Sequence, residues 1–336
     1  MDPCWYVTAS WGIHDERWTE ALRAQGFDPR IISLERDGIT IEQALQRLRE
    51  SATEGDRSPV LAGPLTSVTA HLVGIPQRLV GLSWGFDLLD SAEVPVNLAQ
   101  LDHLIVDSPA SAAIAEAAGL PHERISQIYW GIDLDVFTAD GPRADLTDLG
   151  VPAGLPTVLS LRAHEDLYRV GDLIEAWPAV LGHHEDAHLL IGNTGSLTNA
   201  LTARAHELGI AGSVHFIDRI PEDDLPQLLR AASLYVSTSP VDGTSVTLLQ
   251  AMACGCPVLV TDAPGNRHWI ERGLGGYLFA PGNINELSHS INAALSESGS
   301  SHQQDMVEAS LQAVESRADW KQNQQLLRTA LAATVA

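Results

Sequence analysis

The sequence has little positive charge. Its 20 lysine and arginine residues face 43 aspartate and glutamate residues, so the formal net charge is −23, and Lys321 is the only lysine. Nucleic acid and anionic lipid surfaces repel a chain with this balance. We therefore expect no nucleic-acid partner, whereas for a lipid surface a local basic patch stays the alternative.

Cysteine is scarce as well, and long apolar runs are missing. The three cysteines, Cys4, Cys254 and Cys256, form no disulfide framework and suit a reducing compartment. The last two lie in an apolar stretch, which favours small buried residues over a metal site. The chain has no run of about 18 apolar residues and no basic segment leading into an apolar one. We expect a cytoplasmic protein without stable membrane insertion.

What the chain does contain is enough apolar material for a large core. Its 336 residues are 45% hydrophobic and 19% charged, which is the composition of a globular protein. This length predicts two domains or one large domain.

Short apolar runs alternate with amphipathic stretches along the whole chain. This alternation predicts parallel sheets covered on both faces by helices. The expected strands are residues 5–9, 30–34, 60–62, 78–82, 103–106, 157–161, 188–191, 214–217, 234–237 and 257–261. The expected helices are residues 16–25, 41–49, 111–118, 171–181, 197–208, 224–232 and 285–296, with a long helical stretch over roughly 303–334.

The pattern restarts after residues 138–156, a loop rich in Gly and Pro that is the expected domain boundary. We therefore expect an α/β protein with Rossmann-like, doubly wound domains over residues 1–142 and 155–305. The segment 306–336 is expected to pack back on the first domain. Ligands bind such sheets at the carboxyl ends of the strands. A Gly-x-Gly-x-x-Gly fingerprint and a Walker-type lysine loop are both missing, which argues against a simple dehydrogenase or a P-loop enzyme.

Residues 239–258 carry the strongest functional signal. They predict a strand end, a polar turn with Asp242, Gly243, Thr244 and Ser245, and then a short apolar helix. Free N–H groups and the positive end of a helix dipole favour phosphate at such a turn, and Gly243 allows close backbone approach. The alternative is an ordinary capped helix between two core strands.

This stretch resembles the donor-site motif of the retaining glycosyltransferases of family 4. In that motif an acidic residue is followed, after seven others, by Glu and then by a Gly-x-Pro-Val strand. Here the acid is Asp242, and Gln250 stands in place of the Glu. The resemblance implies the GT-B fold, in which two Rossmann-like domains face a central cleft. It also implies transfer of a sugar from a nucleoside-diphosphate sugar to a hydroxyl acceptor, with retention and without a metal or another cofactor.

Further segments carry the same resemblance. Arg162, after an expected strand, and Arg169, shortly before a helix, resemble the family's Arg and Lys that hold the diphosphate. A guanidinium keeps the charge but presents a planar fork. Asn193 lies in a Gly-containing loop like the family's, and Arg219 with Ile220 matches the loop beside the nucleobase. For the two arginines of the first segment, a salt-bridged surface is the alternative.

Other donor-side positions depart from the family. Gln250 stands where the family's Glu accepts hydrogen bonds from ribose, and an amide keeps one acceptor but loses the charge. Gly265 and Asn266 are expected to contact the donor sugar through their backbone, with an ordinary loop as the alternative. His268 replaces an acidic residue of the family.

On the acceptor side, the resemblance points to the turns after the first and the fourth expected strand. Gly12, His14 and Asp15 lie in the first turn, and Trp84 and Asp87 lie in the second. Trp84 suits stacking on the face of a sugar, and the carboxylates suit hydroxyl contacts. Helix capping by Asp15 and core packing of Trp84 are the alternatives.

Two short segments look like metal sites. The Asp-Leu-Asp of residues 133–135 resembles the Asp-x-Asp of metal-dependent transferases, but it also matches a structural turn of family 4. The His-His-Glu-Asp-Ala-His of residues 183–188 lies between a helix and a strand, which favours a solvated turn. We therefore expect no metal.

In the implied reaction, departure of the diphosphate builds negative charge on its oxygens. Arg162, Arg169 and the N–H groups of residues 243–245 would stabilise that charge, and Asp242 would bind hydroxyls of the donor sugar. The replacements at Gln250 and His268 keep open the alternative of a catalytically weak nucleotide- or sugar-binding partner protein. A GT-B sugar-nucleotide epimerase is a further alternative. The residues leave the base, the sugar, the acceptor and the oligomeric state open.

Overall fold

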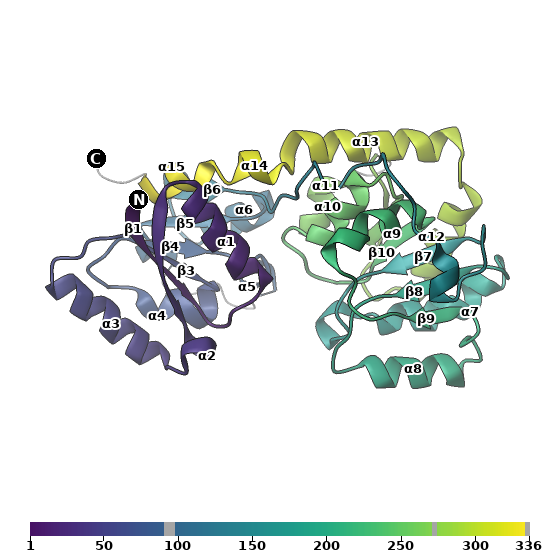
Figure 1. Cartoon of the computed structure of the whole chain (residues 1–336), viewed down its shortest axis with the longest axis horizontal. Helices are drawn as coiled ribbons and strands as arrows, with labels where there is room; N and C mark the ends of the chain where they lie inside the picture. The colour runs from purple at the N-terminus through teal and green to yellow at the C-terminus, as the bar shows by residue number, and fades with distance from the viewer. Residues whose placement is uncertain (91–97, 271–273, 333–336) are drawn as a thin grey trace. The chain divides into compact units, whose positions relative to one another are not determined.

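The computed structural model describes residues 1–90, 98–270 and 274–332 (Figure 1). Contacts divide the chain into two compact units. The first is Met1–Trp130 together with Trp320–Ala336, and the second is Gly131–Asp319. Each unit contains one parallel sheet of six strands.

The sheet of the first unit has the strand order β2-β1-β3-β4-β5-β6, and all neighbouring strands are parallel. Three of its four inner strands, β3, β4 and β5, are buried along their whole length, as expected for a parallel sheet covered on both faces. The strands are β1 Asp2–Thr8, β2 Phe27–Ser33, β3 Val60–Gly63, β4 Leu79–Leu82, β5 His103–Val106 and β6 Ile125–Gln127.

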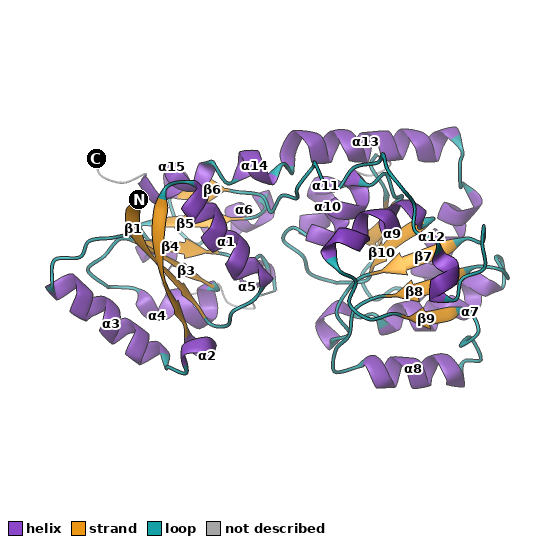
Figure 2. Cartoon of the chain, viewed as in Figure 1, coloured by secondary structure: helices purple, strands orange, loops and turns teal. Residues whose placement is uncertain are grey.

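Helices lie on both sides of these strands (Figure 2). Local signals fix several of their ends, and α3 is an example. Its N-cap Thr40 accepts from the Gln43 backbone N–H, while the Gln43 side chain accepts from the Thr40 N–H. The helices of this unit are α1 Ile13–Ala24, α2 Leu34–Asp37, α3 Ile41–Thr53, α4 Ala70–Leu72, α5 Phe86–Leu89, α6 Pro109–Ala117, α14 Trp320–Asn323 and α15 Leu326–Ala332.

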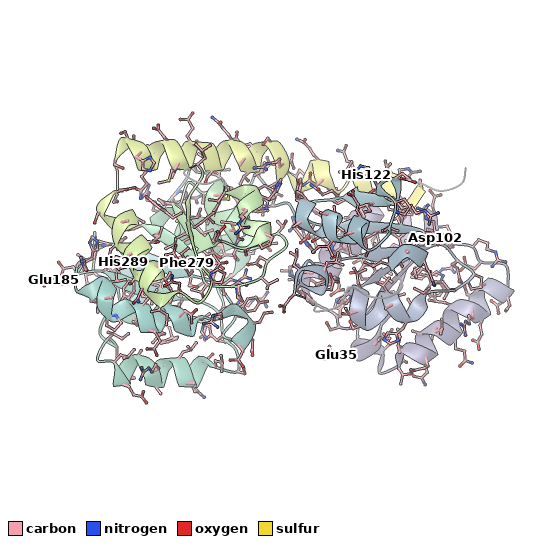
Figure 3. The ribbon with its side chains drawn as sticks, turned by 180° about the vertical axis from the view of Figure 1, so that it is seen from behind. Glu35, Asp102, His122, Glu185, Phe279 and His289 are labelled. Carbon is pink, nitrogen blue, oxygen red and sulfur yellow. The ribbon has the colours of Figure 1, made fainter. Side chains whose placement is uncertain are left out.

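The sheet of the second unit has the order β12-β11-β10-β7-β8-β9, again with parallel neighbours. Its core includes the fully buried Trp177 and Phe279, the latter labelled in Figure 3. The strands are β7 Thr157–Ser160, β8 His188–Ile191, β9 Val214–Phe216, β10 Leu234–Ser237, β11 Val258–Thr261 and β12 Tyr277–Phe279.

The helices of the second unit cover both faces of its sheet (Figure 2). They are α7 Gly171–Leu181, α8 Thr198–Glu207, α9 Leu225–Ala231, α10 Val246–Ala253, α11 Pro264–Trp269, α12 Ile284–Ser296 and α13 Ser301–Arg317. Short 3₁₀ or π turns complete the two units at Leu65–Thr69, Leu98–Gln100, His122–Arg124, Leu146–Leu149, Asp166–Tyr168 and Glu222–Asp224. In the described part of the chain, no helix is both long enough and apolar enough to span a membrane.

The expected doubly wound α/β architecture is confirmed. Strands 103–106, 188–191 and 234–237 and helix 171–181 have the expected bounds. Strand β2 begins three residues before the expected start at residue 30. The sequence did not predict β6 and β12, which are three-residue edge strands. Apart from the buried Phe279, their side chains are partly exposed, which gives a weak apolar signal.

The C-terminal half differs from expectation in two places. The segment that contains Gly265 and Asn266, for which an ordinary loop was the alternative, forms helix α11. The stretch 303–334 is divided into α13, α14 and α15, and its last two residues lie outside the described residues. The break falls at Ala318 and Asp319, where Ile132 N donates to Ala318 O at 2.8 Å.

The division by contact falls at Trp130 and Trp320. By this measure residues 131–154 and 306–319 belong with the second unit. The rings of Trp18 and Trp130 pack against Trp320, at centroid distances of 5.5 and 6.2 Å, and hold α14 in the first unit. The expected domain bounds at residues 142, 155 and 306 stay a prediction.

Candidate functional site

A buried ion pair joins the ends of two neighbouring strands of the second unit. Arg162 follows β7, Asp242 follows β10, and these two strands are paired in the sheet. Arg162 Nη2 donates to Asp242 Oδ1 at 2.8 Å, and Nη1 donates to Ser245 Oγ at 2.9 Å. The side chains of Arg162 and Asp242 are only 10% and 13% exposed. Three residues proposed for one site from the sequence are therefore in contact.

The guanidinium of Arg162 is held on its face as well as on its edge. Its Cζ lies 4.4 Å from the centroid of the Tyr168 ring, and Tyr168 O accepts from Thr238 Oγ1 at 2.8 Å. Burial, the largest single effect, lowers the pKa of Arg162, but Asp242, Tyr235 and Tyr168 together outweigh it and the pKa is raised. Arg162 is thus a positioned cation at the carboxyl end of the sheet.

Ser245 connects this pair to helix α10 and to the sheet. Its hydroxyl caps α10 by accepting from Leu248 N at 3.4 Å. The same oxygen lies 3.3 Å from Thr247 Oγ1, which lies 2.7 Å from the Tyr235 hydroxyl oxygen. Tyr235 is fully buried on β10, and burial raises the pKa of its phenol, so the hydroxyl keeps its proton. A chain of hydroxyl groups therefore anchors Ser245.

Several buried polar atoms in this region have no hydrogen-bond partner among the described residues, including the hydroxyl oxygens of Ser160 and Ser237 at the ends of β7 and β10. Three more of them lie on residues predicted for the donor site, namely Arg162 Nε, Asp242 Oδ2 and Gln250 Oε1, and each has less than 1 Å² of exposed surface. Leaving such an atom unpaired destabilises a protein by about 1–3 kcal/mol. Unpaired groups gathered in one region therefore indicate a ligand that supplies the missing partners.

Helix α11 packs on the turn that carries Asp242. A Cβ atom on Gly265 would lie 1.9 Å from Asp242 O and 2.2 Å from Gly243 O, so only glycine allows this approach. The Asn266 side-chain amide donates to Thr261 O at 3.0 Å and to Thr261 Oγ1 at 3.1 Å. Gly265 thus sets the backbone of the turn, and Asn266 ties α11 to the end of β11.

His268, in the position of the family's acid, contacts a cation. Arg317 Nη1 donates to His268 O at 3.0 Å and lies 3.1 Å from His268 Nε2. The Arg317 guanidinium also lies over the ring of Trp269, with Cζ 4.9 Å from its centroid. Burial and the charge of Arg317 lower the pKa of His268 to about 4. The imidazole is therefore neutral at pH 7, and its Nε2 accepts from Arg317.

This contact predicts a loss of stability in acid. The unfolded histidine titrates at 6.5 and the folded His268 at about 4, so between these values the unfolded state binds the extra proton. Stability contributed by His268 is therefore lost as the pH falls through this window. An H268Q variant keeps an acceptor for Arg317 but does not titrate, so its thermal midpoint should fall less steeply than that of the wild type.

His103 of the first unit offers the matched comparison. Burial lowers the pKa of His103 to about 4 as well, and its Nε2 lies 2.8 Å from Ser126 Oγ. H103Q should remove a second, independent part of the decrease in thermal midpoint with falling pH. In the double variant the two reductions should add. If H268Q lost stability with pH as steeply as the wild type, the lowered pKa assigned to His268 would be wrong.

Arg169 does not join Arg162. Its Nε and Nη2 donate to Asp172 Oδ2 and Oδ1 at 2.8 and 3.0 Å, at the start of α7. Its backbone is left-handed, with a φ of 51°. The ring beside Arg162 belongs to Tyr168. The diphosphate role of Arg169 stays a prediction, and the N–H groups of its Nη1 are not used in the pair with Asp172.

Three other predicted donor residues lie in the loops after β8 and β9. The strands β7, β8 and β9 are parallel neighbours, so these loops leave the same edge of the sheet as Arg162. Asn193 has a left-handed φ of 81°, and its side-chain oxygen accepts from the Thr194 N–H. Arg219 is exposed and Ile220 is half-buried, so both are open to a ligand.

Both carboxylates predicted on the acceptor side are engaged inside the first unit. Asp15 is 1% exposed and accepts from the Tyr6 hydroxyl and from the Gly12 N–H, each at 2.9 Å. It therefore caps α1, which was the alternative interpretation. Asp87 is 2% exposed and accepts from Leu65 N at 2.9 Å, and burial raises the pKa of its carboxyl. The expected contacts of these two residues with hydroxyl groups of an acceptor stay a prediction.

The aromatic candidates of the first unit are better placed. The ring of His14 lies edge-on to Trp84 and Trp130, at centroid distances of 5.5 and 4.7 Å. Both His14 and Trp84 are partly exposed. Burial lowers the pKa of His14, so its imidazole is neutral at pH 7. The carboxyl ends of β1 and β4 thus present an aromatic surface.

Four supporting residues were not predicted from the sequence. Tyr168, Tyr235 and Thr247 hold the Arg162 cluster, and Arg317 holds His268. Tyr235 gave a usable signal, because a tyrosine in a buried strand needs a partner for its hydroxyl. Arg317 gave none, because its partner is 49 residues away.

The two segments that look like metal sites have other roles. Asp133 Oδ1 accepts from the Asp135 N–H at 2.9 Å and shapes a turn. His183 and His184 donate to backbone carbonyl groups. Across residues 1–90, 98–270 and 274–332, no three or more His, Cys, Asp or Glu side chains are grouped so that they could hold a metal ion.

Two doubly wound units with a ligand-type site at the carboxyl ends of the strands define the GT-B class of proteins, and solved structures share this fold. HepE from Anabaena, crystallised with UDP, matches with a TM-score of 0.79 and 20% identity over 99% of this chain and 100% of that chain. Sucrose-phosphate synthase from Thermosynechococcus elongatus matches with a TM-score of 0.78 and 18% identity over 99% and 100%. At these identities the likeness shows the fold.

The sequence comparison identifies the family. Residues 144–313, about half of the chain, match the profile described as glycosyl transferases group 1, and the chain belongs to that family. The D-inositol 3-phosphate glycosyltransferase of Nocardiopsis dassonvillei is 27% identical over 208 residues, which are 59% of this chain and 48% of that protein. The enzyme of the same name from Mycobacterium sp. (strain JLS) is 28% identical over 203 residues, 59% and 45%. The chain thus spans about half the length of these relatives.

Proposed function

We propose that this protein is a retaining, metal-independent glycosyltransferase that moves a sugar from a nucleoside-diphosphate sugar to a hydroxyl acceptor. The observation that carries the proposal is the set of unpaired buried atoms around the Arg162–Asp242 pair. Membership of glycosyl transferases group 1 supports it.

The unpaired atoms are of two kinds, and a nucleotide sugar carries groups that match both. Arg162 Nε is a donor on a cation, which suits a phosphate oxygen. Asp242 Oδ2 and Gln250 Oε1 are acceptors, which suit hydroxyl groups of a sugar and of a ribose. A ligand that is anionic in one part and rich in hydroxyls in another therefore fits the region.

The reaction needs charge stabilisation more than it needs a protein nucleophile. As the bond from the anomeric carbon to the phosphate oxygen breaks, negative charge grows on the diphosphate, and the positioned guanidinium of Arg162 stabilises it. Asp242 fixes the donor sugar through its hydroxyls. The acceptor oxygen forms the new bond to the anomeric carbon from the same face and gives its proton to the departing phosphate oxygen. This course retains the anomeric configuration.

The relatives support nucleotide-sugar chemistry. HepE was crystallised with UDP, and also with UDP-glucose. The two D-inositol 3-phosphate glycosyltransferases share the family. Because this chain spans about half the length of the latter and is only distantly related to the former, the donor sugar and the acceptor of those proteins are not carried over.

Gln250 gives weight to a second candidate, a catalytically weak nucleotide-binding protein that partners an active enzyme. Its amide lacks the charge of the family's Glu, and its Oε1 is unpaired and buried. The two candidates differ in turnover. A transferase releases nucleoside diphosphate from a donor when an acceptor is supplied, whereas a partner protein binds without turnover.

Nucleotide binding is the first expectation to test. We expect one of UDP, GDP, ADP, CDP and dTDP to raise the thermal midpoint of the purified protein, in the presence of EDTA. A ligand at 100 times its dissociation constant stabilises a protein by about 2.7 kcal/mol, which amounts to several degrees. The nucleotide that stands out identifies the donor class.

Matched controls separate this site from weak phosphate binding. Inorganic pyrophosphate and the corresponding nucleoside monophosphate should give smaller shifts. An R162M variant should give none, whereas R204M, which removes an exposed arginine paired with Glu175, should respond as the wild type does. If no nucleotide changes the midpoint at millimolar concentration, the proposed function is wrong. A shift without any turnover of donor supports the second candidate.

A further inference from the structure

The Arg162–Asp242 pair is closed in this structure. Arg162 Nη2 donates a hydrogen bond to Asp242, Nη1 donates one to Ser245, and the face of the guanidinium lies on the ring of Tyr168. The two atoms that a nucleotide sugar would use, Arg162 Nε and Asp242 Oδ2, each expose less than 1 Å². A ligand can reach both atoms only after the groups that now cover them have rearranged.

The pair has the features of one that opens. Only one carboxylate oxygen of Asp242 accepts a hydrogen bond from Arg162, and the other oxygen has no partner among the described residues. The nearby Arg169–Asp172 pair is different, because two nitrogens donate to two oxygens there. Two-pronged arginine–carboxylate contacts are the stronger kind. The single contact of Asp242 can therefore be exchanged more easily.

We infer that Arg162 exchanges Asp242 for the diphosphate of the ligand, and that Asp242 thereby makes the site prefer a sugar-bearing nucleotide over the bare nucleoside diphosphate. The inference rests on the proposed function, and it assigns Asp242 a role in specificity and in product release beyond positioning the sugar.

The preference follows from what Asp242 contacts after the exchange. With a nucleotide sugar, the carboxylate leaves Arg162 and gains hydroxyl groups of the sugar. With the bare diphosphate, it leaves Arg162 and gains nothing, so a mostly buried carboxylate lies without partners. Once the sugar has been transferred, Asp242 competes with the product for Arg162. When Asp242 displaces the product from Arg162, the site returns to the closed pair of the free protein.

An Asp242→Asn variant tests the exchange. Asparagine keeps the shape of the side chain but weakens the bond to Arg162, so the bare nucleoside diphosphate should bind about tenfold more tightly, the effect of weakening one charged hydrogen bond. The matching nucleoside-diphosphate glucose should bind no more tightly, because Asn also loses sugar contacts. Calorimetry with the nucleotide found by the thermal panel, or with UDP and UDP-glucose if none stands out, measures both constants. The preference for the sugar nucleotide should fall by tenfold or more.

Two controls separate exchange from simple repulsion between Asp242 and the phosphates. Repulsion across solvent is screened by salt, whereas a buried contact is screened much less, so the gain should persist at high salt. E175Q removes the carboxylate charge of the exposed pair with Arg204 and should leave both constants unchanged. A gain that vanishes at high salt, or an Asp242→Asn variant that binds the diphosphate no better or more weakly than the wild type, overturns the inference.

The wild type supplies a measurement that does not depend on how the variant folds. In protein with ¹⁵N-labelled arginine, the Nε–H signal of Arg162, identified by its absence in R162K, should shift when the diphosphate is added, because Nε gains an acceptor. A signal that stays in place while the nucleotide binds shows that the pair remains closed and the inference is wrong. If neither the wild type nor the variant binds any nucleotide, the proposed function fails together with the inference, which is a distinct outcome.

Discussion

Replacing Arg162 with methionine is expected to abolish nucleoside-diphosphate binding and to lower the free energy of unfolding by several kcal/mol. The substitution removes the cation, the bond to Ser245 and the partner of a carboxylate that is 13% exposed. Removing one member of a buried ion pair destabilises a protein by about 3–5 kcal/mol, because the other charge stays buried without compensation. Binding is lost because a fixed positive charge is the group that a diphosphate needs most.

Denaturant unfolding measures the loss of stability, and calorimetry measures the loss of nucleotide binding. Two further variants serve as comparisons. R162K keeps the charge without the fork that reaches Asp242 and Ser245 together, so it should bind the nucleotide at least tenfold more weakly than the wild type. R204M removes a guanidinium that is 43% exposed and paired with Glu175. Exposed pairs contribute about 0.2–1 kcal/mol, so this variant should be nearly as stable as the wild type. An R162M protein as stable as R204M, with intact binding, would refute the role given to Arg162.

The part of the site that could be predicted from the sequence is the part set by short connections. Arg162, Asp242 and Ser245 each follow a strand closely or cap the next helix, so a parallel sheet brings them to one edge. Arg169 was harder to place, because Asp172 three residues later competes for its guanidinium. That spacing was visible in the sequence, but its outcome depends on the left-handed backbone at Arg169.

The acceptor side shows why a carboxylate after a strand is an ambiguous signal. Asp15 and Asp87 lie where a sugar-binding residue would lie, and also where a capping residue would lie. In the structure the first carboxylate accepts from the Tyr6 hydroxyl and the second from the Leu65 N–H. Leu65 is 22 residues from its partner, and such a contact follows from packing rather than from local pattern.

The same reasoning covers the fold. Buried inner strands such as β5 and β10 are continuous apolar runs and were found with their bounds. The edge strands β6 and β12 bury less of their side chains, so their pattern is indistinct. The break of the C-terminal helical stretch at Ala318 was also not predicted, and the carbonyl group of Ala318 accepts from the N–H of Ile132, which is far away in the sequence.

Gly265→Ala is the second substitution with a large expected effect. The new Cβ would lie 1.9 Å from Asp242 O and 2.2 Å from Gly243 O, which no pair of atoms at rest tolerates. Since both neighbours are backbone atoms, either α11 or the Asp242 turn must move. Overpacking of this kind destabilises a protein by about 1–3 kcal/mol. A shift of about 1 Å at a group that positions substrate can lower kcat/KM by about 100-fold.

Gly212→Ala is the matched control for this prediction. A Cβ on Gly212 meets nothing within 4 Å, and its backbone is outside the left-handed region, so its stability should change by no more than about 0.5 kcal/mol. Nucleotide affinity by calorimetry and unfolding by denaturant should therefore both separate the two variants. A Gly265→Ala protein that loses stability but keeps its affinity would show that α11 yields rather than the turn, and that Gly265 supports the fold without setting the position of Asp242. If the turn moves, we expect the folded Gly265→Ala protein to bind the nucleotide more weakly than the wild type. The Gly212→Ala protein should keep the affinity of the wild type.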